Sequence, residues 1–242
     1  MKNQIKTLLV FAAVSMVLYS CTEEGSQTVN KVSARPSAPI LANTVKIGTQ
    51  VWMARNLNVS HYSDGTPIPQ VTDITQWPYL TTGAWCYYDN DSSNGPIYGK
   101  LYNWYAVAGI YDAASAANPA LRKKLAPTGW HIPSFWEWVT VTDFLGGMNV
   151  AGGPMKATTL WSAPNTAASN SSGFTGLPAG VLVGGYNMRF DYIGLYCSFW
   201  TSKEREGDPR FAWVRKLYYN QINAFSTDSP KVSGLSVRCL RD

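Results

Sequence analysis

The sequence predicts an α+β fold, a mixed domain of short strands, about two helices and long loops. Three observations support this prediction. The segment 134–147 carries start, periodicity and stop signals of a helix. Short alternating apolar stretches follow residue 173 and are separated by Gly and polar turn residues. The chain also has 10 Trp, 14 Tyr and 8 Phe but only 14% charged residues, which is typical of a compact, loop-rich domain.

The first half of the domain is expected to hold short strands joined by turns. Residues 45–57 predict two strands around Gly48, and residues 84–88 predict a third strand. Residues 101–108 predict a short helix that ends at Gly109. This half should therefore contribute small sheets and little helix.

The clearest helix begins after Ser134. Its hydroxyl and the carboxylate of Glu137 form a capping box pattern, in which each side chain accepts a hydrogen bond from the other residue's backbone N–H. One apolar face follows at helical spacing and is made of Phe135, Trp138, Val141 and Leu145. Gly146 and Gly147 stop the helix, which we expect to be a core element.

The second half is Gly-rich and alternating, and it predicts four strands. They lie at residues 199–202, 211–219, 222–225 and 235–240.

Residues 1–20 have the layout of a lipoprotein signal peptide. Lys2 and Lys6 precede an apolar run at 8–18, and a run of about 11 residues is too short to span a bilayer core of about 30 Å. The run ends at Cys21 in a sequence that resembles the lipobox of bacterial lipoproteins. We therefore expect cleavage before Cys21 and a lipid on its thiol.

Residues 21–43 then form a lipidated polar linker, and residues 44–242 form the folded domain. Glu23 and Glu24 resemble the surface-export signal of Bacteroidetes-type lipoproteins, and a solvated charge pair in a linker is the alternative. We expect a protein lipid-anchored at the outer membrane or cell surface, and the sequence does not choose the face of that membrane. The formal net charge of +5 is scattered along the chain, which excludes a nucleic-acid-binding stripe.

No pattern predicts a catalytic residue, a metal site or a cofactor. The turn residues at 89–96 include two carboxylates at a spacing that calcium ligands can have. The segment lacks the residue order of an EF-hand, so we expect a capped turn. Of the two histidines, His61 is expected at the surface and His131 in a structural hydrogen bond. The remaining cysteines either form one disulfide or stay buried as thiols, and they are Cys86, Cys197 and Cys239.

Several motifs in a fixed order resemble the Fibrobacter succinogenes major paralogous domain. They are VKIGTQVWMARNL at 45–57, WCYYDND at 85–91, YGKLYNW at 98–104, GWHIPS at 129–134 with EW at 137–138, GFTGLPAG at 173–180, FWTS at 199–202 and SVRC at 236–239. The resemblance covers about residues 44–242. It implies a C-type-lectin-like fold with short antiparallel sheets, paired terminal strands and long middle loops that carry any ligand site.

Aromatic side chains are the candidate ligand contacts, because exposed rings can stack on sugars. We expect Trp77, Trp161, Tyr186 and Tyr192 to lie exposed in loops, and the tryptophans of predicted elements to lie in the core. The leading hypothesis is a non-enzymatic surface lipoprotein whose lectin-like module binds a glycan or protein partner in adhesion. The alternatives are an enzyme acting on polysaccharide or exported proteins and a structural component of an envelope assembly.

Overall fold

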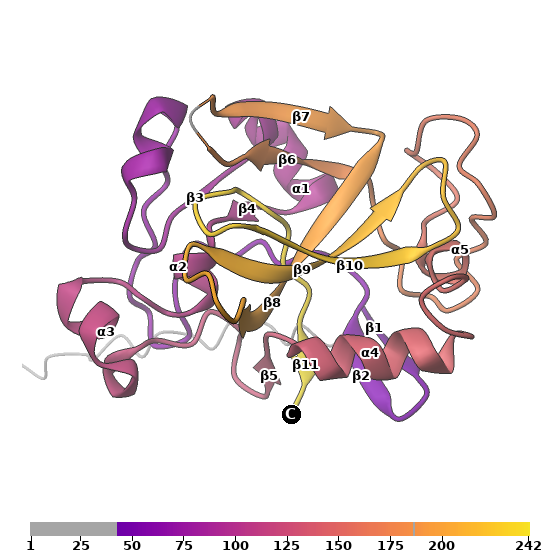
Figure 1. Cartoon of the computed structure of the whole chain (residues 1–242), viewed down its shortest axis with the longest axis horizontal. Helices are drawn as coiled ribbons and strands as arrows, with labels where there is room; N and C mark the ends of the chain where they lie inside the picture. Colours follow the sequence, from indigo (N-terminus) through magenta and orange to yellow (C-terminus); the bar gives the residue numbers. More distant parts are fainter. Residues whose placement is uncertain (1–42, 186) are drawn as a thin grey trace, which may run out of the picture. The chain divides into compact units, whose positions relative to one another are not determined.

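Three sheets of short strands organise the part of the chain that the computed structural model describes, residues 43–185 and 187–242 (Figure 1). The four-stranded sheet has the order β1-β2-β11-β5 and consists of β1 (Thr44–Ile47), β2 (Gln50–Met53), β5 (Trp130–His131) and β11 (Leu240–Arg241). The five-stranded sheet has the order β10-β9-β8-β6-β7 and consists of β6 (Ala179–Val183), β7 (Arg189–Ile193), β8 (Tyr196–Glu204), β9 (Phe211–Tyr218) and β10 (Ala224–Pro230). The small third sheet pairs β3 (Trp85–Cys86) with β4 (Leu101–Tyr102). The strand pairs are antiparallel except for the β6–β8 pair.

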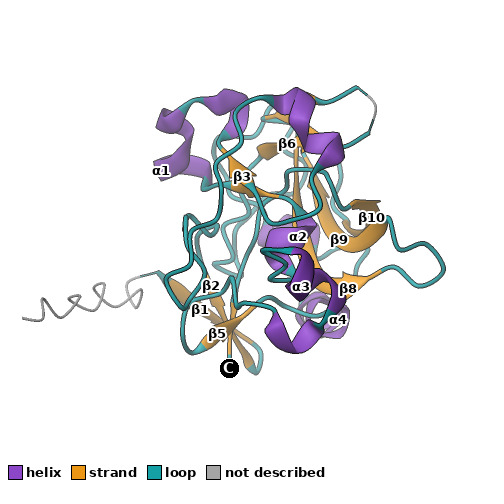
Figure 2. Ribbon diagram, turned by 90° about the vertical axis from the view of Figure 1, so that its left-hand side faces the viewer, coloured by secondary structure: helices purple, strands orange, loops and turns teal. Residues whose placement is uncertain are grey.

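Short 3-10 helices lie at η2 (Ile74–Tyr79), η3 (Tyr88–Asn90), η4 (Ser92–Asn94) and η5 (Pro119–Leu121). The α-helices are also short, more of them form than the two or so expected, and only one exceeds five residues in the described part of the chain. They are α1 (Gly95–Tyr98), α2 (Trp104–Val107), α3 (Ala113–Ala117), α4 (Phe135–Phe144) and α5 (Gly152–Met155). Helix α2 packs on β8, and α4 packs on β8 and β9 (Figure 2). Among the described residues, no helix has the length and apolar character needed to cross a membrane. The predicted α+β class is confirmed, whereas the predicted signal peptide, Cys21 and nearly all of the linker lie outside the described residues.

The predicted helix is confirmed as α4. Ser134 Oγ accepts from the backbone N–H of Glu137 at 3.3 Å, and the Glu137 carboxylate accepts from the N–H of Ser134 at 2.7 Å. Trp138 and Val141 are fully buried on its core-facing side. Gly147 ends the helix by donating its N–H to the Thr142 carbonyl at 2.9 Å.

The two ends of the domain are joined in one sheet, because β11 pairs with β2 through Leu240 and Trp52. Just before β11, the fully buried side chain of Arg238 donates to the Asn56 side chain at 2.7 Å and to the carbonyl of Met53 at 2.9 Å. It also donates to the carbonyl of Phe174, whose ring stacks 4.4 Å from the guanidinium. Arg238 thus ties the N-terminal and C-terminal segments to the middle of the chain.

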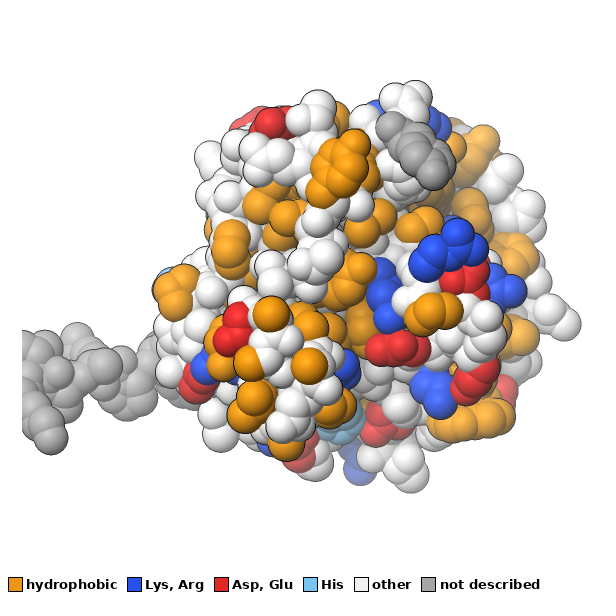
Figure 3. Space-filling view, turned by 60° about the vertical axis from the view of Figure 1, so that its left-hand side comes forward, with side chains coloured by type: hydrophobic (Ala, Val, Ile, Leu, Met, Phe, Trp, Pro, Cys, Tyr) orange, Lys and Arg blue, Asp and Glu red, His pale blue; other side chains and the backbone are white. Residues whose placement is uncertain are grey.

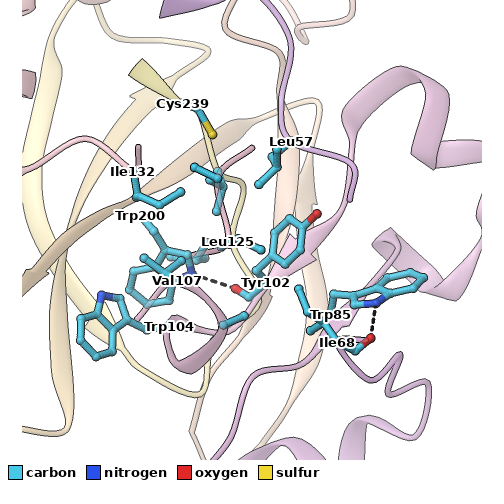
Figure 4. Packing of buried hydrophobic residues seen from close by; sticks show 14 of the residues in the cluster. Leu57, Ile68, Trp85, Tyr102, Trp104, Val107, Leu125, Ile132, Trp200 and Cys239 are labelled. Carbon is cyan, nitrogen blue, oxygen red and sulfur yellow. Dashed lines mark hydrogen bonds between the residues drawn. The ribbon is translucent and has the colours of Figure 1, made fainter. Parts of the chain in front are cut away.

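The core consists of three clusters of buried side chains. In the first, Trp200 donates its indole N–H to the Tyr102 carbonyl at 2.8 Å, and Trp85 donates to the Ile68 carbonyl at 2.8 Å (Figure 4). Each cluster holds one cysteine, and the three thiols form no disulfide with one another. All three are buried and unpaired, and they are Cys86, Cys197 and Cys239. Of the two alternatives, the structure therefore supports buried thiols.

Some predicted element boundaries are wrong. Residues 101–108 form β4 followed by a single turn, α2, because Leu101 pairs with Cys86 before the helix can begin. The predicted strand at 222–225 is instead β10, which starts at Ala224 and extends to Pro230. Residues 235–240 form isolated bridges and only reach regular pairing at β11. Strands β6 and β7 were not predicted, because Gly interrupts the apolar pattern around them.

Candidate ligand-binding site

Four aromatic side chains form a continuous line across one face of the five-stranded sheet. Neighbouring ring centroids lie 4.5 Å, 5.2 Å and 5.4 Å apart, in the order Tyr192, Tyr196, Tyr218 and Phe225. We call these four residues the aromatic row. Phe225 is 37% exposed and the three tyrosines are partly exposed, so the row borders solvent while its lower side is packed.

Strand register explains most of the row. Tyr196 of β8 lies directly opposite Tyr218 of β9, and directly opposite residues point to the same face of an antiparallel pair. Phe225 of β10 lies opposite Lys216, which places its ring diagonally from Tyr218 and within contact of it. The row therefore crosses β8, β9 and β10 in turn, three strands that are labelled in Figure 1.

A tight turn brings Tyr192 to the end of the row. The N–H of Leu195 donates to the Tyr192 carbonyl at 2.9 Å, and Gly194 between them has a φ of +79°. Tyr192 itself has a φ of +68°, a left-handed conformation that costs an L-residue about 1–2 kcal/mol. The turn holds that conformation and folds the Tyr192 ring back onto Tyr196.

A hollow of about 390 Å³ opens at the β10 end of the row. Its walls combine rings with amide, hydroxyl and ammonium groups from β9, β10 and the turn between them, and they are Lys216, Tyr218, Asn220, Gln221, Phe225, Ser226 and Thr227. An Arg189–Asp191 ion pair of 2.9 Å lies at the β7 end, beside Tyr192. The row thus has polar groups at both ends, which is the pattern of a site that orients a ligand stacked on apolar rings.

A buried lysine supports the site from behind. The Lys156 ammonium is fully buried and donates to the carbonyls of Tyr218 at 3.0 Å, Gln221 at 2.9 Å and Thr166 at 2.8 Å. Burial lowers the pKa of Lys156 to about 8. These three bonds fix the end of β9 and the turn that closes the hollow.

Burial also raises the pKa of Tyr196 and of Tyr218 above the ordinary phenol value. Both hydroxyls therefore stay protonated at neutral pH. They can donate a hydrogen bond as well as accept one.

The expectation that Trp77 and Trp161 are exposed is wrong. Trp77 is 0% exposed, and its indole N–H donates to the Val71 carbonyl at 3.0 Å. Trp161 is 9% exposed and donates to the Gly176 carbonyl at 3.0 Å. Trp77 lies in a 3-10 helix, Ile74–Tyr79, rather than in a loop. Both segments fold over the core because the indole supplies apolar area and a donor for a buried carbonyl. The expectation that Tyr192 lies exposed in a loop is also wrong, because it lies in strand β7, is only partly exposed and belongs to the aromatic row. Tyr186 lies outside the described residues.

The other three rings of the row were missed from the sequence. Tyr218 and Phe225 fell within predicted strands, and their alternation with Leu217 and Ala224 was the signal that could have placed them on one face. A second exposed apolar surface was also missed, on the outer side of α4, where Trp136 is 73% and Phe144 is 64% exposed. A helical projection of residues 135–144 would have separated both from the core-facing side.

The remaining polar candidates have structural contacts. His131 Nε2 contacts the Glu137 carboxylate and Nδ1 contacts the Asp242 carboxylate, each at 2.8 Å. With both ring nitrogens engaged, His131 joins β5, α4 and the end of the chain, as the predicted structural role requires. In the 89–96 loop, the Asp91 carboxylate accepts from the N–H of Ser93 at 2.9 Å and forms a capped turn.

Charged side chains of both signs lie beside one another on the face that Figure 3 shows. Several ion pairs join such side chains in the described residues, for example Lys231 with Glu204 at 3.0 Å and Lys203 with Glu206 at 2.9 Å. Within the described residues, no group of three or more His, Cys, Asp or Glu side chains is placed to hold a metal ion.

Comparison with known proteins identifies one family. The sequence profile of the Fibrobacter succinogenes major domain matches residues 45–241. No curated protein and no solved structure matches the chain.

Proposed function

The chain belongs to the Fibrobacter succinogenes major domain family, and from this premise we propose that it is a surface lipoprotein whose domain binds a glycan. The aromatic row, defined above as Tyr192, Tyr196, Tyr218 and Phe225, is the observation that carries the proposal. Sugar rings have flat apolar faces and hydroxyl edges, so they need aromatic faces beneath them and polar groups beside them. The row supplies the first and the hollow at its β10 end supplies the second.

The proposed anchor is the lipid on Cys21, which would hold the domain at the outer membrane or cell surface through the linker at 21–43. The support is the apolar run that ends in the lipobox-like sequence before Cys21. A lipid anchor needs no membrane-spanning helix, since the buried acyl chains contribute about 0.8 kcal/mol per methylene. Such a position suits adhesion to polysaccharide outside the cell.

The proposed fold family is C-type-lectin-like. Its support is the pairing of β2 with β11, which joins the two ends of the domain, and the long segments between short sheets. In this proposal the glycan is bound by the aromatic row on the sheet formed by the second half of the domain. Recognition by rings and polar side chains does not require the calcium-binding triplets of sugar-binding C-type lectins. Binding is therefore expected to persist in a chelator.

A glycan array with and without calcium tests the proposal on the purified chain. Phe225→Ala removes the most exposed ring of the row and is expected to weaken binding by about 1–2 kcal/mol, or about 5–30-fold. Trp136→Ala is the matched control, because it removes an exposed ring on α4 and should leave binding unchanged. Absence of binding to every glycan, or equal binding by Phe225→Ala and the wild type, would refute the proposal.

A structural role in an envelope assembly is the second candidate. Exposed apolar side chains on α4 and just after it favour this role, since Trp136 and Phe144 of α4 and Met148 in the segment that follows are each more than 40% exposed, and exposed apolar surface often marks a protein contact. In this case Trp136→Ala would change co-purification with envelope components, whereas Phe225→Ala would not.

A further inference from the structure

One ammonium group in the hollow has no partner of its own. Lys216 lies on β9 and points to the same face as Tyr218, two positions along the strand. Its Nζ lies 5.8 Å from the centroid of the Tyr196 ring, and its side chain lines the hollow. The cation is therefore part of the surface that a ligand on the aromatic row would meet.

Many other cations of the described residues have an ion pair or hydrogen bonds, which Lys216 lacks. Surface cations such as Arg189, Lys203 and Arg205 form ion pairs with carboxylates. Buried cations such as Lys156 and Arg238 donate to several oxygen atoms each. Within residues 43–185 and 187–242, Lys216 has neither a hydrogen bond nor an ion pair.

The carboxylate whose charge acts on Lys216 is already engaged. Burial lowers the pKa of Lys216, and the charge of Asp228 on β10 offsets only part of this effect. The Asp228 carboxylate forms an ion pair with Arg205. Directly opposite Lys216 on β8, the buried hydroxyl of Ser198 also has no hydrogen-bond partner in the described residues. The Ser198 hydroxyl is fully buried and does not line the hollow, so the ammonium is the group that an added anion would reach. A partly buried ammonium without a carboxylate partner is a position where such an anion gains charge pairing and a charge-assisted hydrogen bond.

The spacing fits a sugar that carries an acidic group. Side chains two positions apart on one face of a strand are separated by about 6–7 Å, so a ring stacked on Tyr218 has its edge near Lys216. Asn220, Gln221 and Thr227 line the same hollow and can bind hydroxyl groups. Rings, amides and one ammonium together match an anionic saccharide rather than a neutral one.

We propose that the glycan bound by the aromatic row is anionic, and that Lys216 binds its carboxylate or sulfate group. This inference rests on the proposed glycan-binding function and specifies the class of glycan. Lys216 is then the residue that determines specificity, while the rings supply affinity that neutral sugars share.

Matched saccharide pairs test the inference on the purified chain. Each pair has one backbone in a neutral form and in a carboxylated or sulfated form, so separate arms distinguish uronic acids from sulfate esters. We expect the wild type to bind one anionic form at least about 10-fold more tightly than its neutral match, which corresponds to about 1.4 kcal/mol. The preference should decrease at high salt, because exposed charges are screened.

Three variants assign the preference to its residue. Lys216→Met should bind the anionic and the neutral form equally well, so the ratio of the two affinities falls to about 1, and Lys216→Arg should keep the preference. Lys203→Met is the matched control, since this exposed lysine already pairs with Glu206, and it should behave as the wild type does.

The outcomes separate the inference from the function on which it rests. Equal affinity for anionic and neutral forms, with binding still lost in Phe225→Ala, would overturn the inference and keep the proposed function. A preference that survives in Lys216→Met would also overturn the inference. No binding of either form would overturn both.

Discussion

Replacing Arg238 by Lys tests how the ends of the domain are held together. The guanidinium is fully buried and donates to four different oxygen acceptors, from Met53, Asn56, Phe174 and Thr175. A lysine keeps the positive charge but replaces the planar fork by one ammonium on a flexible stem. We expect it to reach at most two of the four acceptors.

The magnitude follows from the acceptors that lose their donor. Each buried acceptor left unsatisfied costs about 1–3 kcal/mol, so two of them lower the free energy of unfolding by about 2–6 kcal/mol. For a domain of about 200 residues, each kcal/mol corresponds to about 2–4 °C in melting temperature. Arg238→Lys should therefore melt on the order of 5–20 °C below the wild type.

Urea and thermal unfolding followed by tryptophan fluorescence measure this change. Arg205→Lys is the matched control, because Arg205 is 44% exposed and forms a surface ion pair with Asp228, and such pairs contribute about 0–1 kcal/mol. An Arg238→Lys protein that unfolds within about 1 kcal/mol of this control would refute the reasoning, since the buried acceptors would then not depend on the fork.

Three further predictions concern the rest of the fold. Burial lowers the pKa of His131, but its hydrogen bonds to the carboxylates of Asp242 and Glu137 outweigh this effect and raise the pKa overall. The charged imidazolium therefore stabilises the fold fully below about pH 6.5, and this stabilisation is lost as pH rises through the raised pKa. The difference in melting temperature between the wild type and His131→Gln should accordingly become smaller from pH 6 to pH 8. A difference that stays constant over this range would contradict the prediction. Gly109→Ala should unfold at much lower urea concentration, because a Cβ there would lie 1.9 Å from the Lys123 carbonyl at a φ of +73°, and an unchanged midpoint would show that the close approach is absent. Cys86, Cys197 and Cys239 are all buried and unpaired. A thiol reagent should therefore label none of these three cysteines in the folded domain and all three after denaturation. Fast labelling of any of them in the folded domain would contradict their place in the core.

The sequence predicted correctly those helices and turns that are determined by residues close together in the chain. The capping box at Ser134 and Glu137 is complete within four residues, and α4 forms where it indicates. The turn at Gly48 likewise requires a φ of +60°, which explains why two strands meet there. Helix 101–108 was predicted wrongly because the pairing of Leu101 with Cys86 depends on a strand further back in the chain.

The candidate site could be predicted only in part. Tyr192 was chosen as a residue in a loop, and its place in the row depends on the turn that folds it onto Tyr196. Whether a loop tryptophan is exposed depends on which carbonyl its indole can reach, as Trp77 and Trp161 show. Neither the register of β8 against β9 nor the order of strands in the sheet is encoded in local periodicity, so the row is visible only in three dimensions.

The most direct test of the central claim locates the glycan on the protein. The purified chain, with ¹³C-labelled tyrosine and phenylalanine rings assigned by single substitutions, is titrated with the saccharide that the array selects. We predict that ring signals of Tyr192, Tyr196, Tyr218 and Phe225 shift together and saturate with one dissociation constant, while Phe144 on α4 does not shift. Saturable shifts confined to α4, or binding with no shift in the aromatic row, would contradict the account.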